Sequence, residues 1–315
     1  MSELLRVEGL KKYFKTAKGQ LHAVDDVSFS IQKGETLGVV GESGCGKSTL
    51  GRCIIHLLDT TDGKIFFEGK DITNISKAEL KDIRKDMQMI FQDPFSSINP
   101  RMTVKNIIME PMVIHNMHDG NRAKQEEEVM KIMDTVGLAR RLADSYPHEL
   151  DGGRRQRIGI ARALALEPKF IVCDEPVSAL DVSIQAQILN LMQDLQEERG
   201  LTYIFITHDL SVVKHISDNI CVMYLGNLVE KCAADKLFEK QFHPYTQALL
   251  SAIPVAKVGV KRERILLKGE ITSPINPEPG CRFAQRCLYA KPECFQKQPE
   301  LKELEPGHFV ACHLY

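Results

Sequence analysis

The sequence predicts an α/β protein with a mostly parallel sheet. Short apolar runs rich in β-branched residues alternate with helical patterns, most clearly at Thr36–Val40, Phe170–Cys173, Tyr203–Thr207 and Asn219–Tyr224. Strands separated by helices at this spacing are typical of parallel sheets with helices on their faces. Polar or acidic motifs follow the strand ends, which is where open α/β sheets bind their ligands.

The composition excludes several classes of protein. With 315 residues the chain is long enough to bury a sizeable core, so a disordered protein is not expected. A formal net charge of -1 argues against nucleic-acid binding as the main activity. No apolar run approaches the length of about 18 residues that crosses a bilayer, and the first residues lack the pattern of a secretion signal. We therefore expect a cytosolic chain that reaches a membrane only through partner subunits.

A glycine-rich loop follows the first predicted strand. Its sequence fits G-x-x-x-x-G-K-[ST], in which backbone N–H groups and a helix N-terminus hold phosphates. Lys47 suits the outer phosphates of a nucleotide, and the Ser48 hydroxyl is a hard oxygen that Mg²⁺ accepts. A chance glycine-rich turn is disfavoured because the flanking strand and helix are the context that the motif requires. The predicted nucleotide-binding residues of the loop are Gly41, Glu42, Ser43, Gly44, Cys45, Gly46, Lys47, Ser48 and Thr49.

Two adjacent carboxylates end the strand at Phe170–Cys173. Asp174 can join the Mg²⁺ shell, and Glu175 can polarise an attacking water, a role in which a general base contributes about 10²–10⁴ in rate. Such a pair can equally be a polar strand end, but the phosphate loop favours the functional interpretation. Gln92 and His208 also follow apolar strands and can reach the metal, the water or the γ-phosphate. Alone, a glutamine or histidine at such a position is usually structural.

Taken together, these motifs resemble the ATP-binding subunit of an ABC transporter over roughly residues 4–250. The family motifs are, in chain order, Walker A at Gly41–Thr49, the Q-loop at Gln92, the signature at Leu150–Arg154, Walker B at Asp174, the catalytic carboxylate at Glu175, the D-loop at Ser178–Asp181 and the switch histidine at His208. The resemblance implies a P-loop NTPase fold with an antiparallel β subdomain. It also implies ATP as the nucleotide, Mg²⁺ held by Ser48, Gln92 and Asp174, and catalysis by Glu175, His208 and Gln92.

An aromatic residue near the start of the chain is the expected contact of the adenine base. The family stacks an aromatic ring on adenine there, and Phe14 occupies that position, with Tyr13 as the alternative. Both residues could equally belong to the core of the first strands.

A helical subdomain is expected over about residues 103–165, because the stretch has helical periodicity, charged faces and no convincing strand. In proteins that it resembles, this insertion carries the signature and docks, with the Q-loop, on a membrane subunit. Two ATPase chains then face head to tail, so that each ATP lies between one Walker loop and the other signature. The residues expected to act on the partner's ATP are Asp151, Gly152, Gly153, Arg154 and Asp181.

The signature departs from the family pattern Leu-Ser-Gly-Gly-Gln, because Asp151 and Arg154 replace its serine and glutamine. Gly152 and Gly153 still let a helix start approach phosphate. Asp151 is a good N-cap, worth about 1 kcal/mol. A carboxylate about 4 Å from a phosphate, however, costs on the order of 4 kcal/mol at an effective dielectric of about 20. Arg154 or Arg155 is the expected compensator, and we expect a heterodimer with two unequal ATP sites.

Four of the nine cysteines lie in the proline-rich tail, with the spacing C-x₅-C-x₆-C-x₁₇-C. The other five are scattered, as small apolar core residues are. Spacing alone leaves an iron–sulfur cluster, zinc and free thiols open, since zinc sites usually contain C-x₂₋₄-C pairs. The tail, with the segment His243–Ser251, resembles the C-terminal region of oligopeptide and dipeptide transporter ATPases. That resemblance implies a four-iron, four-sulfur (4Fe-4S) cluster on Cys281, Cys287, Cys294 and Cys312.

The resulting prediction is an ATPase subunit that drives import of di- or oligopeptides. Residues 1–250 would form the ABC ATPase domain and residues 251–315 a C-terminal module with the cysteine cluster. The expected partners are a second ATPase subunit, two transmembrane permease subunits and an extracellular peptide-binding protein, at the cytoplasmic face of the membrane. The alternatives are a non-transport ABC ATPase acting on ribosomes or DNA, an importer of nickel, sugars or glutathione, and a simple P-loop kinase, which would not need residues 150–154.

Overall fold

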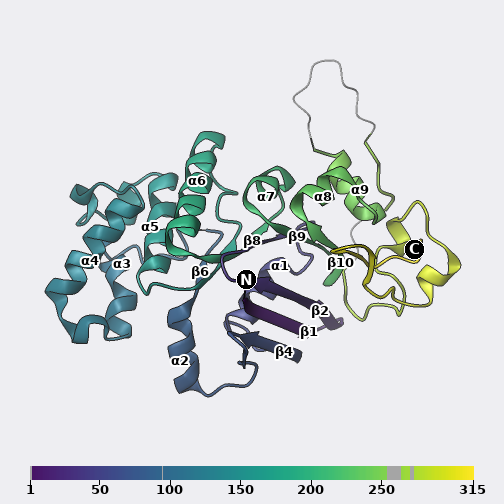
Figure 1. The fold of residues 1–315 in the computed structure, drawn as a ribbon, viewed down its shortest axis with the longest axis horizontal. Helices are drawn as coiled ribbons and strands as arrows, with labels where there is room; N and C mark the ends of the chain where they lie inside the picture. Colours follow the sequence, from purple (N-terminus) through teal and green to yellow (C-terminus); the bar gives the residue numbers. More distant parts are fainter. Residues whose placement is uncertain (1, 94, 254–263, 270–272) are drawn as a thin grey trace, which may run out of the picture. The chain divides into compact units, whose positions relative to one another are not determined.

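The computed structural model describes residues 2–93, 95–253, 264–269 and 273–315. They form two compact units, one made of residues up to 74 together with 205–315, and one of residues 75–204. Both units contain helices and strands (Figure 1), so the predicted α/β class is confirmed. Among the described residues, no helix has both the length and the apolar character that crossing a membrane requires.

One sheet of the first unit is antiparallel throughout, with the strand order β2-β1-β4-β5. Leu5 and Val7 of β1 are buried, with the alternation expected of a strand that lies on a core. Gly9, at φ +55°, lies where the register shifts between Val7 and Leu10, and so forms a β-bulge. The strands are β1 (Glu3–Thr16), β2 (Gly19–Gln32), β4 (Asp62–Phe67) and β5 (Lys70–Asp71).

Five further strands of the first unit are hydrogen-bonded in the order β11-β12-β10-β9-β3. They are β3 (Thr36–Val40), β9 (Asn219–Tyr224), β10 (Asn227–Ala233), β11 (Lys302–Glu305) and β12 (His308–Val310). β3 and β9 are parallel, whereas the other neighbours pair antiparallel, so the prediction of a mostly parallel sheet is only partly correct. The reason is the two-residue turn after β9. Leu225 and Gly226 both have positive φ, +43° and +86°, as in the tight turns that join antiparallel strands.

The last three helices of the first unit contribute side chains to a core that contains three buried aromatic residues. Tyr224, Tyr245 and Phe283 are buried and lie 4.7–5.5 Å apart between ring centroids. Tyr224 and Tyr245 meet edge to face, which is a favoured arrangement of aromatic rings. The helices are α1 (Lys47–Ile54), α7 (Leu210–Ile216), α8 (Ala234–Glu239) and α9 (Pro244–Ser251).

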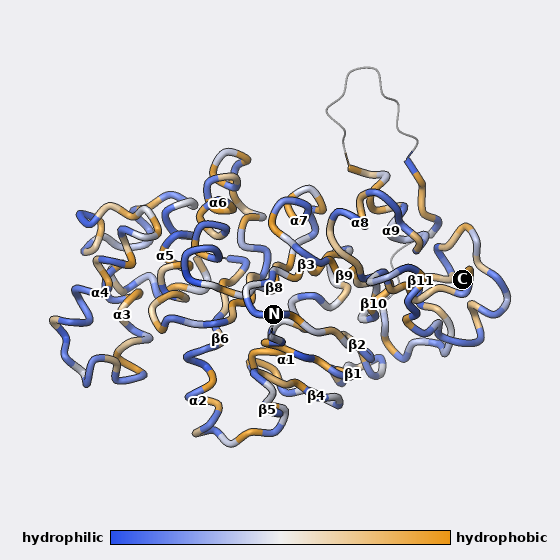
Figure 2. The backbone as a smooth tube through the Cα atoms, in the orientation of Figure 1, coloured by the Kyte–Doolittle hydropathy of each residue, from blue (hydrophilic) through white to orange (hydrophobic). Residues whose placement is uncertain are grey.

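The second unit is mainly helical. Its strands β6 (Met87–Ile90) and β7 (Phe170–Asp174) pair in parallel, and β8 (Thr202–Thr207) spans the division between the units. No strand forms between residues 103 and 150, as expected. Helix α2 buries none of its residues and is largely blue in Figure 2. The helices are α2 (Lys77–Asp86), α3 (Val104–Ile114), α4 (Arg122–Thr135), α5 (Gly152–Leu164) and α6 (Val182–Arg199), with 3₁₀ turns at Met117–Gly120, Arg140–Leu142 and Pro147–Glu149.

The cysteine-rich tail, residues 273–315, belongs to the first unit, so a separate C-terminal module is not confirmed. Besides β11 and β12 it contains 3₁₀ turns at Ala284–Arg286 and Pro292–Phe295. Glu230 of β10 is fully buried and lies 2.7 Å from Nε2 of His308 in the tail. Its carboxylate also accepts the backbone N–H groups of Phe242 and His243, at 2.8 and 3.1 Å. The tail therefore supplies one of the hydrogen-bonding partners of the buried Glu230 carboxylate.

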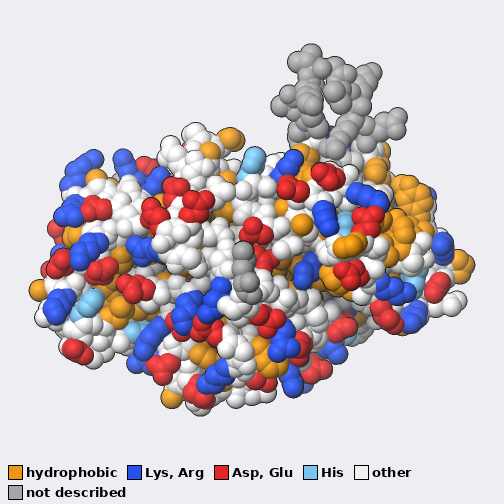
Figure 3. All heavy atoms as spheres, viewed as in Figure 1, with side chains coloured by type: hydrophobic (Ala, Val, Ile, Leu, Met, Phe, Trp, Pro, Cys, Tyr) orange, Lys and Arg blue, Asp and Glu red, His pale blue; other side chains and the backbone are white. Residues whose placement is uncertain are grey.

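Charge is mixed on the molecular surface. On the face drawn in Figure 3, acidic and basic side chains are interspersed, in agreement with the small net charge. Several form surface pairs, such as Lys33 with Glu68. Exposed pairs of this kind contribute about 0–1 kcal/mol each, so we assign most of the stability to the buried contacts.

Candidate nucleotide-binding and hydrolysis site

The glycine-rich loop between β3 and α1 is surrounded by close backbone contacts. Gly41 and Gly46 have φ values of +152° and +106°. A Cβ atom at Gly41 would lie 2.2 Å from the carbonyl oxygen of Met223, and one at Gly46 would lie 2.0 Å from that of Ala23. Only glycine fits at either position. Because α1 begins at Lys47, the loop ends at the positive end of a helix, the arrangement that binds phosphate.

Lys47 lies within this loop and is only 5% exposed. Its Nζ donates hydrogen bonds to the carbonyl oxygens of Gly41 and Glu42, at 2.8 and 3.0 Å. The ammonium group is therefore held beside the backbone amides that the motif uses for phosphate. Ser48 follows in the first turn of α1, so the loop presents a cation and a hydroxyl from adjacent positions.

The two candidate aromatic residues, near the end of β1, have different surroundings. Tyr13 stacks on His22 with ring centroids 3.8 Å apart, and its hydroxyl donates to Asp25. Burial and this hydrogen bond raise the pKa of Tyr13. Phe14 is half-buried, and the ammonium of Lys12 lies 5.0 Å from the centroid of its ring. Tyr13 is thus engaged within the chain on one face and at its hydroxyl, which favours Phe14 as the adenine contact.

In the second unit, Gln92 and Glu175 lie together. Asp174 ends β7 and is fully buried. Glu175 follows at φ +47°, a left-handed conformation that is uncommon for residues other than glycine and clusters at functional sites. Nε2 of Gln92 donates a hydrogen bond of 2.9 Å to Oε2 of Glu175, and the Ser178 hydroxyl donates to the backbone carbonyl of Glu175 at 3.1 Å. Two predicted catalytic residues are thus in direct contact.

The segment Leu150–Arg154 begins helix α5, and Asp151 is its N-cap. Oδ1 of Asp151 accepts the N–H of Arg154 at 2.8 Å, and Oδ2 lies 3.3 Å from Nη1 of the same arginine. Arg155 instead donates to the carbonyl of Leu150 at 3.0 Å. Arg154 is therefore the arginine that partly neutralises Asp151. Both side chains are about half exposed, so the pair adds little stability.

The start of α5 packs against the start of α6. A Cβ atom at Gly153 would lie 2.8 Å from Cγ2 of Ile184, so this glycine allows the close approach. Asp181 caps α6 by accepting the N–H of Ile184 at 3.0 Å and the hydroxyl of Ser183 at 2.7 Å. These hydrogen bonds lower the pKa of Asp181. Asp151 of the signature and Asp181 of the D-loop therefore have the same local role, because each caps the N-terminus of the helix that follows it.

Comparison with known proteins decides the family. Residues 24–178 match the family described as ABC transporter, and residues 229–294 match the oligopeptide/dipeptide transporter, C-terminal region. The oligopeptide transport ATP-binding protein AppF of Bacillus subtilis is 56% identical over 99% of this chain and 97% of its own length. The putative peptide import ATP-binding protein BOV_A0347 of Brucella ovis is 50% identical over 98% of this chain and 97% of its own length. The chain belongs to the ABC transporter ATP-binding family.

Solved structures of ABC proteins share the fold. The ATP-binding cassette MJ0796, in a dimeric post-hydrolysis state bound to ADP and Pi, aligns with a TM-score of 0.68 and 27% identity over 73% of this chain and 99% of that one. The cbiO1 protein of Clostridium perfringens, part of the transporter complex cbiONQ, aligns with a TM-score of 0.67 and 28% identity, over 76% of this chain and 92% of that one.

The predicted Mg²⁺ ligands of this ABC subunit are oxygen donors, the type that Mg²⁺ prefers. Ser48 supplies a hydroxyl in the first unit, while Asp174 and Gln92 supply a carboxylate and an amide in the second. His208 directly follows β8, and the next residue, Asp209, caps α7. These residues fit the predicted roles by chemistry, and the roles remain predictions.

The predicted iron–sulfur cluster is not confirmed. Within the described parts of the chain, no three His, Cys, Asp or Glu side chains are grouped as a metal site. The four tail cysteines nevertheless interact electrostatically with one another. The pKa of Cys281 is raised to about 11, mainly by burial and further by the thiols of Cys294, Cys312 and Cys287. The other five cysteines of this ABC subunit are buried and free. The structure thus brings the tail thiols near one another without forming the ligand geometry of a cluster.

Sequence reasoning missed three residues that contact the Walker A region. Tyr245 and Arg286 bind Glu42, and Arg282 binds Asp25. All three follow the Walker A loop by about 200 residues or more, so no local pattern signals them. All three do lie in the part of the chain that resembles the C-terminal region of peptide-transporter ATPases, but that resemblance does not assign them a role.

Proposed function

We propose that this chain hydrolyses ATP to energise uptake of di- or oligopeptides across the cytoplasmic membrane. The observation that carries the proposal is the match to peptide-transport ATP-binding proteins over 98–99% of the chain, which includes its C-terminal region. The chain would sit peripherally at the cytoplasmic face, on two transmembrane permease subunits. An extracellular peptide-binding protein would deliver the solute.

In the proposed reaction, water attacks the γ-phosphorus of ATP and the bond to the bridging oxygen breaks, giving ADP and phosphate. Lys47 and the amides of the Walker A loop would neutralise charge on the phosphates. Mg²⁺, held by Ser48, Asp174 and Gln92, would supply charge stabilisation between the outer phosphates. Phe14 would stack on the adenine.

Glu175 would accept the proton of the attacking water. Its contact with Gln92 supports this role, because the amide donor fixes the orientation of the carboxylate. His208 would donate to the γ-phosphate. A second ATPase subunit would close the site with its own signature; the related cassette MJ0796 is likewise dimeric in its post-hydrolysis state bound to ADP and Pi.

We further propose that the partner is a different, related ATPase subunit and that the two ATP sites are unequal. The site built on this chain's Walker A loop, Glu175 and His208 would hydrolyse ATP. The site completed by Asp151 would hold ATP longer, because a carboxylate replaces a hydroxyl donor. The pairing of Arg154 with Asp151 supports partial neutralisation of that charge.

Copurification tests the proposal. A tag at Ser2 or Tyr315 should recover two hydrophobic subunits and a second ATPase, and the reconstituted complex should accumulate labelled peptide only with ATP. Recovery of ribosomes or DNA-repair proteins, or ATP-driven uptake of nickel, sugars or glutathione but not peptides, would contradict peptide import.

The tail cysteines remain the proposed ligands of a 4Fe-4S cluster. The support is the resemblance of the tail and the mutual proximity of the four thiols. Iron and acid-labile sulfide in anaerobically purified protein, with absorbance near 400 nm, would establish the cluster. Stoichiometric zinc, or four titratable thiols without metal, would exclude it.

A further inference from the structure

All polar groups of Glu42, the second residue of the Walker A loop, have partners within the first unit. Arg286 of the tail donates two hydrogen bonds to its carboxylate, from Nη1 to Oε2 at 2.7 Å and from Nη2 to Oε1 at 3.1 Å. The N–H of Glu42 donates to the hydroxyl of Tyr245 at 2.8 Å, and its carbonyl accepts from Lys47 at 3.0 Å. Two of these partners, Arg286 and Tyr245, thus come from the C-terminal part of the chain, far from the loop in sequence.

These contacts are partly buried, since the Glu42 side chain is 22% exposed while its partners are less so. Arg286 is 8% exposed, and Tyr224 and Tyr245 are 1% exposed or less. Nη1 of Arg286 lies 3.3 Å from the hydroxyl of Tyr224, and Phe283 packs against both tyrosines. The hydrogen bonds to Glu42 raise the pKa of the Arg286 guanidinium, which stays charged. A two-point arginine–carboxylate pair in such surroundings fixes orientation as well as distance.

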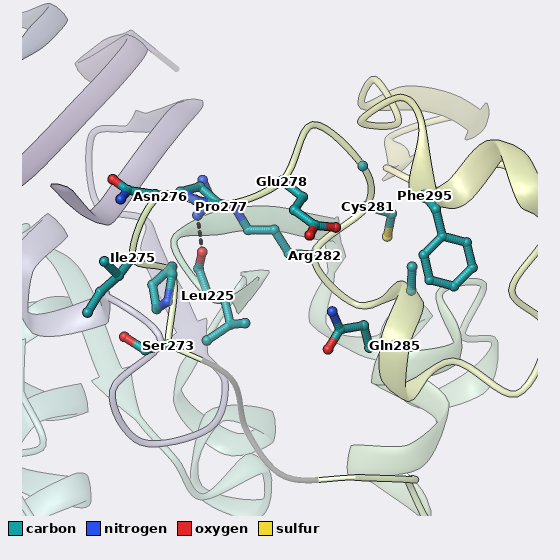
Figure 4. A pocket seen from close by; sticks show the side chains of 13 residues that line it. Leu225, Ser273, Ile275, Asn276, Pro277, Glu278, Cys281, Arg282, Gln285 and Phe295 are labelled. Atoms are coloured by element: carbon teal, nitrogen blue, oxygen red, sulfur yellow. Dashed lines mark hydrogen bonds between the residues drawn. The ribbon is translucent and has the colours of Figure 1, made fainter. Parts of the chain in front are cut away.

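A second arginine of the tail binds beside the loop. Arg282 donates through Nη1 to the carbonyl of Leu225, the contact drawn as a dashed line in Figure 4, and its Nη2 pairs with Asp25. The residue after Leu225, Gly226, donates its N–H to the carbonyl of Cys45 in the Walker A loop at 2.8 Å. Arg282 therefore supports the loop through one intervening turn, whereas Arg286 contacts it directly.

Both arginines lie between two of the tail cysteines. Arg282 directly follows Cys281, and Arg286 directly precedes Cys287. The N–H of Cys281 donates to the carbonyl of Cys294 at 2.7 Å, and the N–H of Cys287 donates to that of Phe283 at 3.0 Å. The backbone around the cysteines thus sets the position from which Arg286 reaches Glu42.

We propose that Arg286 is a positioning residue for ATP, and that the cysteine-rich tail thereby forms part of the nucleotide site of its own chain. Arg286 and Tyr245 hold Glu42, and Glu42 holds the loop in the conformation that binds phosphate. The inference rests on the proposed function only in that this loop binds the phosphates of ATP. The tail would thus affect ATP affinity through the Walker A loop and not through Glu175.

A double-mutant cycle on the full-length chain tests this role. Binding of a fluorescent ATP analogue is measured for the parent chain, Arg286→Met, Glu42→Gln and the double variant. We expect each single change to raise Kd about tenfold, and the double change to add little more, because both remove the same contact. In the reconstituted complex the KM for ATP should rise while kcat stays within about twofold of the parent value.

Controls separate positioning from folding. Lys297→Met breaks an exposed ion pair with Glu300 in the same tail and should leave Kd unchanged. Tyr245→Phe removes the acceptor of the Glu42 N–H but keeps the ring, and should raise Kd even if Arg286→Met proves poorly folded. Arg286→Lys should restore part of the affinity, since it keeps the charge.

The outcomes distinguish this inference from the proposed function. If the parent chain binds the analogue and the folded Arg286, Glu42 and Tyr245 variants bind it equally well, the tail has no positioning role and only this inference fails. Additive losses in the double variant would also overturn it. If the parent chain binds no ATP analogue, the proposed function fails as well.

Discussion

The side-chain amide of Gln92 donates a hydrogen bond of 2.9 Å to the carboxylate of Glu175. The two residues are 83 positions apart and follow different strands, β6 and β7, which pair in parallel. Parallel pairing brings both strand ends to one edge of the sheet. Gln92, at that edge, can therefore fix the orientation of the Glu175 carboxylate.

Replacement of Glu175 by glutamine should reduce ATP hydrolysis by about 10²–10⁴, the contribution of a positioned general base. An amide keeps the size of the side chain but cannot accept the proton of the attacking water. ATP binding should persist, and single-turnover assays with labelled ATP in the reconstituted complex measure the loss. Hydrolysis at the parent rate would contradict the assigned role of Glu175.

Conversion of the signature by Asp151→Ser with Arg154→Gln should change turnover at the site that this signature completes. The serine restores a hydroxyl donor and removes a carboxylate that faces phosphate. Turnover is measured in the complex with the partner's catalytic carboxylate intact and this chain's Glu175 replaced, so that only the altered site contributes. Unchanged kinetics in that background would argue against two unequal sites.

Loss of the ring at Phe14 should weaken nucleotide binding. Stacking of a base on an aromatic side chain is worth about 1–3 kcal/mol by alanine substitution, so Phe14→Ala should raise the Kd for ATP by about 5- to 150-fold. Phe14→Tyr keeps the ring and serves as the matched control. Tyr13→Ala with an effect as large or larger would transfer the adenine contact to the neighbouring residue.

Acidification should destabilise the fold through His243. Burial lowers the pKa of this histidine from 6.5 to about 4. Below pH 6.5 the unfolded chain therefore binds a proton that the folded chain does not, and the free energy of unfolding falls until the pH reaches about 4. At pH 5 this loss is about 2 kcal/mol.

His243→Asn is the matched variant for that measurement. Asparagine can accept the N–H of Tyr245 as His243 does in capping α9, but it does not titrate. Urea unfolding at pH 7.5 and pH 5 should show a smaller fall in the variant than in the parent chain. Equal falls in both would assign the acid sensitivity to other groups.

Local sequence patterns could predict the elements whose contacts lie close in the sequence or are apolar on both faces. The strands expected at Thr36–Val40 and Asn219–Tyr224 have those bounds in the structure, because their apolar runs are buried on both faces. β10 was missed because Glu230 and Lys231 interrupt its apolar pattern. The Glu230 carboxylate tolerates burial because it is hydrogen-bonded by a histidine of the tail, 78 positions later, and by two backbone N–H groups.

The same limit applies to the site. The loop, the carboxylates and the signature could be found because each is a contiguous motif with its own chemistry. The contacts of Glu42 with the tail could not, since an isolated arginine and tyrosine carry no local signal. The expected cluster came from resemblance and spacing, and spacing does not determine whether thiols reach ligand distance.

The contacts of Lys47 affect how the loop chooses among anions. Its ammonium has three N–H bonds, and two of them already point at the carbonyl oxygens of Gly41 and Glu42. Nζ also lies 3.8 Å from Sγ of Cys45, so an anion must displace at least one of these partners to bind the ammonium closely. Weakly basic ions such as chloride or nitrate gain little from that exchange, whereas the multiply charged oxygens of a polyphosphate gain much. The resting hydrogen bonds should therefore favour polyphosphates over singly charged anions at this loop.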